Sequence, residues 1–321
     1  MIYEPWNALE APRFTGPRTF ARLPVVRELD GVDAAVFGMP WDGGTSFRSG
    51  TRFGPEAIRS ASGMIRTYNA VQRVQVFGSL SCIDYGDAPT APGYIEETLR
   101  RIEEFVAPLA RAGVPSVGMG GDHSVTLAEL RALAAVHGPL GLVQLDSHTD
   151  LWDSYNGLPY AHGTMFRRAI EEGVVDTRRM LQAGIRGSLY GEDDEGIPAE
   201  LGVETIPWIE LSSMSPAELA ERVARRLGDG PAFLSFDVDF VDCAFCPGTG
   251  TPEVAGPTSF EAMQHLRALA AIEFVGYDVV EVAPQYDGPG QPTALFAANA
   301  IFEMLSMLAR RTRAGSSARE S

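Results

Sequence analysis

Residues 114–150 read VPSVGMGGDHSVTLAELRALAAVHGPLGLVQLDSHTD, and this stretch decides the class of fold. An apolar run, Val114–Met119, is followed by a segment with helical spacing, Ser124–His137, which a Gly-Pro pair terminates. A second apolar run, Leu140–Leu145, comes next. Apolar strands joined by a helix are typical of parallel pairs that are buried on both faces, so the stretch predicts a β-α-β unit.

The same alternation of apolar runs and amphipathic segments continues on both sides of this unit, without an internal repeat or a linker rich in Pro, Gly or Ser. We therefore predict an α/β protein with a single domain, residues 1–311, folded as a three-layer α/β/α sandwich around a mainly parallel sheet. The composition of residues 312–321, TRAGSSARES, predicts a disordered C-terminal tail. We expect further strands at Val32–Met39, Met180–Ile185, Ala232–Val238 and Phe274–Val282, and further helices at Tyr94–Ala110, between Ser215 and Gly228, at Thr258–Ala271 and at Thr293–Arg310.

The charge balance excludes several classes of partner. The 321 residues include 26 Lys and Arg against 42 Asp and Glu, which gives a net charge of −16 and a sequence pI of about 4.7. Such a field repels the phosphates of nucleic acids and of anionic lipids, so we expect no nucleic-acid or membrane partner. An acidic excess suits a cationic ligand or bound metal ions, although a solvated acidic surface would give the same count.

The cysteines and the apolar runs bear on the compartment. Cys82, Cys243 and Cys246 are too few for a disulfide framework, and the first residues, MIYEPWNALEAPRF, lack the basic and apolar regions of a secretory leader. The richest apolar run, Ala134–Leu145, is interrupted by polar residues and is shorter than the roughly 18 residues that span a bilayer. We expect a cytoplasmic protein.

Acidic residues and histidines gather directly after three of the predicted strands. Function in open parallel sheets collects beyond the carboxyl ends of the strands, which meet at one edge. If the backbone stays extended, alternation directs Asp237 and Asp239 to the same side, and it does the same for the acidic and His residues of Asp146–Asp150. Taken singly, an Asp-x-Asp pair can cap a strand and His123 can be structural. The candidate metal ligands at this edge are His123, Asp146, His148, Asp150, Asp237 and Asp239.

The charges of these side chains indicate how many ions they would hold. Four carboxylates at one point would repel one another unless cations lay among them, and two divalent ions would balance four negative charges. Carboxylate and imidazole without thiolate suit Mn²⁺ better than structural Zn²⁺, and Ni²⁺, Co²⁺ and Fe²⁺ also accept these donors. The pattern therefore predicts a binuclear metal centre.

The order of the motifs resembles that of the ureohydrolases, a family that comprises arginases, agmatinases, guanidinobutyrases, proclavaminate amidinohydrolase and formiminoglutamases. The resemblance extends from about Pro12 to Arg310 and is greatest to the agmatinase-like branch, in particular to guanidinobutyrase. It implies an arginase-like sandwich, two Mn²⁺ per chain, hydrolysis of a guanidino group to urea and an amine, and a homotrimer or homohexamer. The motifs are GGTSFRSGTRFGP at 43–55, GGDHS at 120–124, DSHTD at 146–150, HGT at 162–164, SFDVD at 235–239, PGTGTPE at 247–253 and EVAP at 281–284.

The resemblance also implies roles for single residues. One metal would be held by His123, Asp146, Asp150 and Asp237, and the other by Asp146, His148, Asp237 and Asp239, so that Asp146 and Asp237 bridge the two. Asp150 resembles the residue that orients the attacking hydroxide. His162 resembles the proton shuttle to the leaving amine, and the alternative is a loop histidine bonded to backbone. Glu281 resembles the carboxylate that pairs with the substrate guanidinium, and the alternative is a capped strand end.

The residues beyond the metal ligands say less about which guanidino compound is hydrolysed. The segment Leu151–Ala161 lies between Asp150 and His162 and should form the pocket wall, where Trp152, Tyr155 and Tyr160 would favour a slim substrate or would pack the loop. Arg66 could receive a substrate carboxylate. We expect 4-guanidinobutanoate or a similar short guanidino acid, and agmatine next. Guanidine or methylguanidine, a formimino substrate, and a non-catalytic subunit of a mixed oligomer are the alternatives.

Two departures from the family pattern are visible. Ser147 stands where Ala is usual, and we expect it to point away from the metals and to be neutral. Cys243 and Cys246 lie where Pro and Ala are common, and we expect buried packing, with a loop disulfide or oxidation-sensitive activity as the alternative.

Overall fold

The structure, a computed structural model, describes residues 2–319. Within this range a single eight-stranded sheet forms the centre of the molecule, with the strand order β4-β1-β5-β10-β9-β6-β7-β8. Every neighbouring pair in this sheet is parallel, which confirms the predicted fold class. The strands are β1 Ala34–Gly38, β4 Cys82–Asp87, β5 Ser116–Met119, β6 Leu140–Leu145, β7 Val175–Ile185, β8 Glu204–Pro207, β9 Ala232–Asp237 and β10 Gly276–Val280. A separate hairpin pairs β2 Tyr68–Asn69 with β3 Val74–Gln75.

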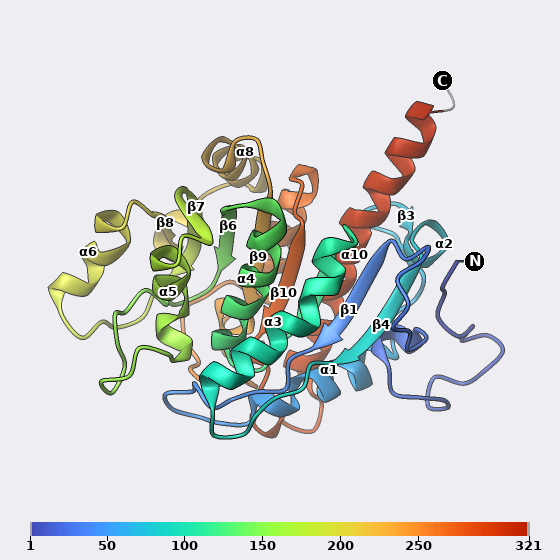
Figure 1. The fold of residues 1–321 in the computed structure, drawn as a ribbon, viewed down its shortest axis with the longest axis horizontal. Helices are drawn as coiled ribbons and strands as arrows, with labels where there is room; N and C mark the ends of the chain where they lie inside the picture. Colours follow the sequence, from blue (N-terminus) through green and yellow to red (C-terminus); the bar gives the residue numbers. More distant parts are fainter. Residues whose placement is uncertain (1, 320–321) are drawn as a thin grey trace.

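Helices cover both faces of the sheet, and the central strands are buried on both sides. One face packs against α3, α4 and α5, and the other against α1, α8, α9 and α10 (Figure 1). Successive strand residues divide between the two cores: Ala35 and Phe37 face the first, and Val36 faces the second. The helices are α1 Gly54–Ser62, α2 Val76–Ser79, α3 Ile95–Arg111, α4 Thr126–His137, α5 Met165–Glu171, α6 Glu192–Glu200, α7 Trp208–Leu211, α8 Pro216–Leu227, α9 Ser259–Ala268 and α10 Pro292–Arg319.

Local sequence signals fix several of these boundaries. The Ser215 hydroxyl accepts the N–H of Glu218 at 3.2 Å, and the Glu218 carboxylate returns to the N–H of Ser215 at 2.8 Å. This capping box starts α8, and Gly228, with φ of 56°, ends it. All six strands that the apolar runs predict are present, although their ends differ by a few residues.

The two strands at the edges of the sheet, β4 and β8, were not predicted from the sequence. β4 has the sequence CIDYGD and carries a carboxylate, Asp84, which is buried. Arg59 compensates this charge, with Nε 2.8 Å from Asp84 Oδ2 and Nη2 3.0 Å from Oδ1. β8 has four residues, too few for a recognisable pattern. Both strands are therefore specified by tertiary contacts rather than by hydrophobic periodicity.

Helix α10 is longer than predicted. It continues to Arg319, so residues 312–319 of the expected disordered tail are helical, and Glu320 and Ser321 lie outside the described residues. No proline interrupts this segment, and each added residue gains a hydrogen bond once the preceding turns have formed. Among the described helices, α10 alone has the length and composition of a membrane span, between Pro292 and Thr312, and 83% of that window is buried inside the fold. Its apolarity is that of a core helix.

Candidate metal centre and active site

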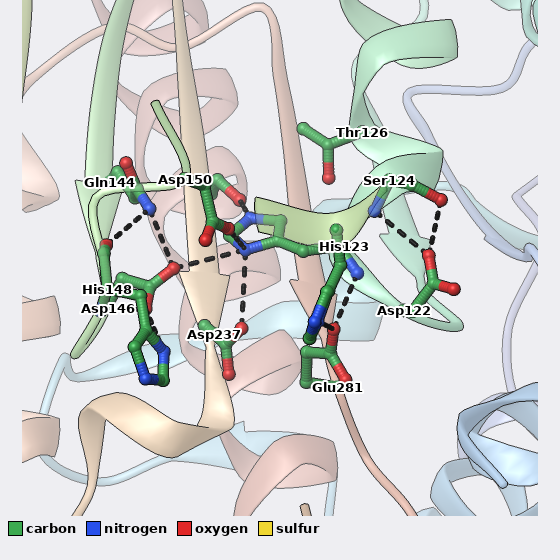
Figure 2. A network of polar contacts seen from close by, with 12 residues as sticks. Asp122, His123, Ser124, Thr126, Gln144, Asp146, His148, Asp150, Asp237 and Glu281 are labelled. Atoms are coloured by element: carbon green, nitrogen blue, oxygen red, sulfur yellow. Dashed lines mark hydrogen bonds and ion pairs between the residues drawn. The ribbon is translucent and has the colours of Figure 1, made fainter. Parts of the chain in front are cut away.

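Four neighbouring strands in the middle of the sheet, β5, β10, β9 and β6, bring the candidate site together at their carboxyl ends (Figure 2). His123 begins a 3₁₀ turn, His123–Val125, after β5, and Glu281 follows β10. Asp237 is the last residue of β9, and Asp146 follows β6. The strand order therefore places side chains from distant parts of the sequence at one edge, as the motif positions predict.

The backbone at these strand ends is not extended, which corrects the alternation argument. After β9 the chain enters a 3₁₀ turn, Val238–Phe240, and the N–H of Asp239 donates to Asp237 Oδ1 at 2.8 Å. After β6 the N–H of His148 donates to Asp146 Oδ1 at 2.6 Å, and Asp150 has φ of 53°. Aspartate turns, rather than strand pleating, bring the carboxylates together.

A close backbone approach explains one glycine of the GGDHS motif. A Cβ on Gly121 would lie 1.7 Å from the carbonyl oxygen of Trp41. The N–H of Asp122 donates to this same oxygen at 2.8 Å. Any larger residue at 121 would separate the two loops and shift His123.

The first cluster surrounds the Nδ1 atom of His123. This atom lies 2.9 Å from Asp150 Oδ2, 3.1 Å from Asp146 Oδ2 and 3.3 Å from Asp237 Oδ2. On the other side of the ring, Nε2 lies 2.8 Å from Ser235 Oγ, which donates its proton to Asp278 Oδ1 at 2.7 Å. Since the serine proton is used, Nε2–H must be the donor to Ser235, and Nδ1 of the neutral ring carries a lone pair.

This arrangement fits a cation. A buried lone pair facing three carboxylates is repulsive unless a proton or a metal ion lies between them, and Nδ1 has no hydrogen-bond partner. Burial would lower the pKa of His123, but the nearby carboxylates of Asp146, Asp150 and Asp237 raise it well above the usual value. Burial, with Asp239 and Asp150 nearby, raises the pKa of Asp146 to about 7. A metal ion at this point would replace the proton that the metal-free cluster must hold.

The second cluster shares Asp146 with the first. His148 Nδ1 lies 3.0 Å from Asp239 Oδ2 and 3.7 Å from Asp146 Oδ1. The ligand atoms of Asp146, His148 and Asp239 all lie within 4.8 Å of one another, as do those of His123, Asp146 and Asp237. Asp146 is thus placed to bridge two ions, whereas Asp237 belongs to the first cluster by this distance.

Neighbouring polar groups hold the ligands in place. Gln144 Nε2 donates to Asp146 Oδ2 at 2.7 Å, and Gln182 Nε2 donates to Gln144 Oε1 at 2.6 Å. Ser147 does not point away from the centre, contrary to expectation: its Oγ donates to Asp239 Oδ1 at 2.6 Å. The turn at the end of β6 directs this hydroxyl toward the carboxylate, so Ser147 fixes the orientation of a candidate ligand.

His162 and Glu281 form the third part of the site. His162 Nδ1 lies 2.9 Å from Glu281 Oε1, and this same oxygen accepts the backbone N–H of His123 at 2.9 Å. His162 Nε2 accepts the N–H of Ser46 at 3.0 Å and lies 2.6 Å from Ser46 Oγ. A backbone N–H can only donate, so in the neutral ring Nδ1–H points at Glu281. Burial lowers the pKa of His162, and the Glu281 carboxylate outweighs it, with a resulting pKa of about 9.

Glu281 has one oxygen left for a ligand. Oε2 is buried without a hydrogen-bond partner, and the residue adopts φ of 66°. A non-glycine residue with this backbone conformation is strained, and such strain collects at functional sites. The strained turn after β10 directs the carboxylate toward His162.

Two buried aspartates hold the glycine-rich loop that carries Ser46. Asp122 Oδ2 accepts the N–H of Gly44 at 2.7 Å, and Asp42 Oδ2 accepts the N–H of Gly50 at 2.7 Å. Arg52 Nε donates to Asp42 Oδ1 at 2.6 Å. Burial, with Glu281 nearby, raises the pKa of Asp122 to about 6. Asp122 is therefore a support of the loop rather than a ligand.

A cavity of about 470 Å³ opens onto the two clusters. His148, Asp150, Asp237 and His162 line it, and so do Trp152 and Tyr155, as the position of Leu151–Ala161 predicts. Its other lining residues include Ser46, Phe47, Ser147, Arg186, Tyr190, Asp194, Thr251 and Glu253.

Arg66, Tyr160 and Glu281, which we expected to contact substrate, are not among the residues that line this cavity, although Glu281 lies directly behind His162, which does line it. Tyr160 packs against the apolar core under α3, α4 and α5. Arg66 lies in the turn between α1 and β2, on the side of the sheet that packs against α10.

The three cysteines, all in the described part of the chain, are unpaired. Cys246 is buried in the apolar core as expected, and Cys243 is half-buried. Several polar residues of the site escaped prediction, because they belong to no metal-binding pattern: Ser46, Gln144, Ser235, Asp278 and Glu253. A polar residue inside a glycine-rich motif is the one signal that could have singled out Ser46.

The fold is that of the ureohydrolases, hydrolases that act on the C–N bonds of amidines. Residues 32–306 match the arginase family. The guanidinopropionase of Pseudomonas aeruginosa is 44% identical over 95% of this chain and 96% of its own length. The mitochondrial agmatinase of Gallus gallus is 43% identical over 95% of this chain and 89% of its own. The crystallised proclavaminate amidino hydrolase of Streptomyces clavuligerus is 38% identical, covers 94% of this chain and 99% of its own, and superposes with a TM-score of 0.89.

The chain belongs to the arginase family. It is a guanidino-compound amidinohydrolase, and the confirmed resemblance extends over nearly the whole sequence.

Proposed function

We propose that the protein hydrolyses a short guanidino compound to urea and an amine at a centre of two Mn²⁺. The observation that carries the proposal is the position of Glu281. Its Oε1 accepts a hydrogen bond from His162 Nδ1, and its buried Oε2 has no hydrogen-bond partner. A carboxylate oxygen of this kind suits a planar guanidinium, which offers parallel N–H donors. The relatives named guanidinopropionase and agmatinase support a guanidino substrate and differ in what lies beyond that group.

The residues of the two clusters would hold the metals. His123, Asp146, Asp150 and Asp237 would bind one ion, and Asp146, His148 and Asp239 the other, to which the family resemblance adds Asp237. Ser147 and Gln144 would orient Asp239 and Asp146. Bound divalent ions supply a water of lowered pKa and stabilise negative charge that develops during hydrolysis. Oxygen and nitrogen donors support Mn²⁺, and Ni²⁺ or Co²⁺ would fit the same set.

The remaining chemistry belongs to the protein. Glu281 Oε2 would align the guanidinium, and Asp150, which lies against His123 Nδ1 and lines the cavity, would orient the attacking water. His162 would protonate the leaving amine from Nε2, with Ser46 Oγ 2.6 Å away to pass the proton into the cavity. The Ser46 N–H opposes protonation of Nε2 and Glu281 favours it, so the two contacts set the acidity of the ring.

The test is urea release by the Mn²⁺-loaded protein from 4-guanidinobutanoate, 3-guanidinopropanoate, agmatine, arginine, guanidine and methylguanidine, repeated with Ni²⁺. Turnover of one compound with urea as product supports the proposal. Formamide as a product from a formimino compound would identify the alternative reaction. Full metal occupancy with no product from any compound would contradict the proposal and favour a non-catalytic subunit, although retention of both His162 and Glu281 argues against that role.

The proposal also covers the oligomeric state of the protein and its cellular compartment. We propose a homotrimer or homohexamer in the cytoplasm. The three unpaired cysteines are compatible with a reducing compartment. The mass measured by light scattering tests the oligomer.

A further inference from the structure

The wall of the cavity between the metal ligands and the solvent is aromatic. The Trp152 ring stacks on Tyr155 with a centroid separation of 5.6 Å and lies 5.4 Å from the Tyr190 ring. The hydroxyls of Tyr155 and Tyr190 are 3.2 Å apart and join the loop after β6 to the loop after β7. Tyr190 is 78% exposed, so these three rings reach from the interior to the rim.

The aromatic wall begins next to the reacting centre. A Cβ placed on Gly163 would lie 2.9 Å from Trp152 Cε3 and 4.0 Å from Asp150 Oδ1. The ring edge of Trp152 is therefore close to a candidate metal ligand and to His162. A substrate whose guanidinium reaches Glu281 would extend its tail along this wall.

The charged groups along the wall are mainly negative. Glu253 lines the cavity, its side chain is 26% exposed, and its carboxylate has a weak partner, His148 Nε2 at 3.9 Å. Asp194 is the second carboxylate, and it accepts the N–H groups of Tyr190 at 2.9 Å and Gly191 at 3.3 Å. Two divalent ions would balance the four aspartates of the clusters, which leaves Glu253 with Arg186 as a nearby positive charge and Asp194 with backbone donors alone.

One arginine, Arg186, is present among the described residues that line the cavity. Its guanidinium donates to backbone oxygens of Val254 at 3.1 Å, Gly184 at 3.3 Å and Asp239 at 2.8 Å. A fourth contact reaches the carbonyl oxygen of Glu253 at 3.4 Å. These contacts hold the loop 252–256 against the end of β7 and use four of the five N–H groups of the guanidinium.

We propose that this cavity selects guanidino compounds whose far end carries a positive charge, with an ammonium group held by the Trp152, Tyr155 and Tyr190 rings and by Glu253. The inference rests on the proposed function and reverses our expectation of a guanidino acid. Aromatic faces attract cations, and a nearby carboxylate adds to that attraction. A carboxylate tail would instead meet the negative charges of Glu253 and Asp194.

The experiment compares three guanidino compounds of equal methylene count that differ at the far end: agmatine, 5-guanidinopentanoate and the neutral pentylguanidine. We expect kcat/KM for agmatine to exceed that for the acid by at least tenfold. Equal or higher values for 5-guanidinopentanoate would overturn the inference while leaving the proposed function intact. No urea from these or from other guanidino compounds would contradict the proposed function itself.

Variants of Glu253 and Trp152 test whether the cavity wall causes the preference for a cationic far end. Glu253→Gln should reduce the ratio of kcat/KM for agmatine over pentylguanidine about tenfold, and Glu221→Gln, on the exposed face of α8, should leave this ratio unchanged. Because the ratio is internal to one preparation, partial loss of metal cancels. Trp152→Phe should keep most of the ratio and Trp152→Leu should lose it, since a leucine has no aromatic face. An unchanged ratio in Glu253→Gln and Trp152→Leu alike would contradict the assignment.

Discussion

The imidazole of His162 and the carboxylate of Glu281 are joined by a 2.9 Å contact between Nδ1 and Oε1, although 119 residues separate them in sequence. Through this contact the Glu281 carboxylate orients the imidazole ring and raises its pKa. His162→Asn should lower kcat by about 10²–10⁴, the usual contribution of a positioned acid, and should leave the metal content unchanged. Steady-state kinetics and metal analysis on the same preparation check this. Full turnover by His162→Asn would show that His162 moves no proton in the reaction.

Glu281→Gln separates the two roles of that carboxylate. The amide keeps the shape of the side chain but loses the charge, so we expect a higher KM for every guanidinium substrate together with a lower kcat. The proton on His162 should also become more acidic, because the carboxylate is the main influence that raises its pKa. An NMR titration of His162 in the variant measures that change, and an unchanged titration would contradict it.

Ser147→Ala should weaken metal binding at the second cluster. The variant removes the 2.6 Å hydrogen bond to Asp239 Oδ1, and loss of such a supporting contact commonly costs about 10–100-fold in metal affinity. Competition with a chromophoric chelator measures the affinity at each site. Ser212→Ala, at an exposed serine after α7, is the matched control.

Removal of the metals should make stability decrease with rising pH. Burial raises the pKa of Asp146 to about 7, above its value in the unfolded chain, so the folded state binds more protons from about pH 4 to pH 7. Stability is then greatest below this window and is lost as the pH rises through it. His123 contributes in the same direction, because its folded pKa is also raised. Thermal melts of the chelated protein should show this slope, and the Mn²⁺-loaded protein should not.

Glu129 offers a test outside the site. Both of its carboxylate oxygens are buried without a hydrogen-bond partner, and burial, followed by the nearby Asp278, raises its pKa well above the usual value. Stability conferred by the protonated form is lost as the pH rises above about 4.3, by about 1.4 kcal/mol per pH unit. Glu129→Met should therefore stabilise the protein increasingly from pH 5 to pH 8. Glu221→Met, at an exposed helical position, should show no such trend.

The sequence predicted those features that depend on apolar runs and on the order of the motifs. β6 was predicted to the residue, because Leu140–Leu145 is apolar throughout and Gly-Pro precedes it. The six candidate ligands lie at one sheet edge, because parallel strands share their carboxyl ends. The strand β4 was not predicted, because the buried charge of Asp84 interrupts its apolar run. Arg59, from another element, compensates that charge. The contact of Ser147 with Asp239 depends on a turn whose geometry has no signature in the composition of the loop.

The position of β9 and β10 has a consequence for how the chain is made. These strands lie between β5 and β6, although they leave the ribosome after every other strand of the sheet. A nascent chain that stops before Ala232 carries the four ligands from His123 to Asp150, but it lacks Asp237, Asp239 and the two strands that set the spacing of the site. The centre of the sheet can therefore form only after β9 and β10 have been synthesised. Their pairing with β5 and β6 is non-local, and pairings of this kind form slowly. Occupancy by two ions would thus report that the last third of the polypeptide has been inserted, and a prematurely terminated product could not acquire the pair.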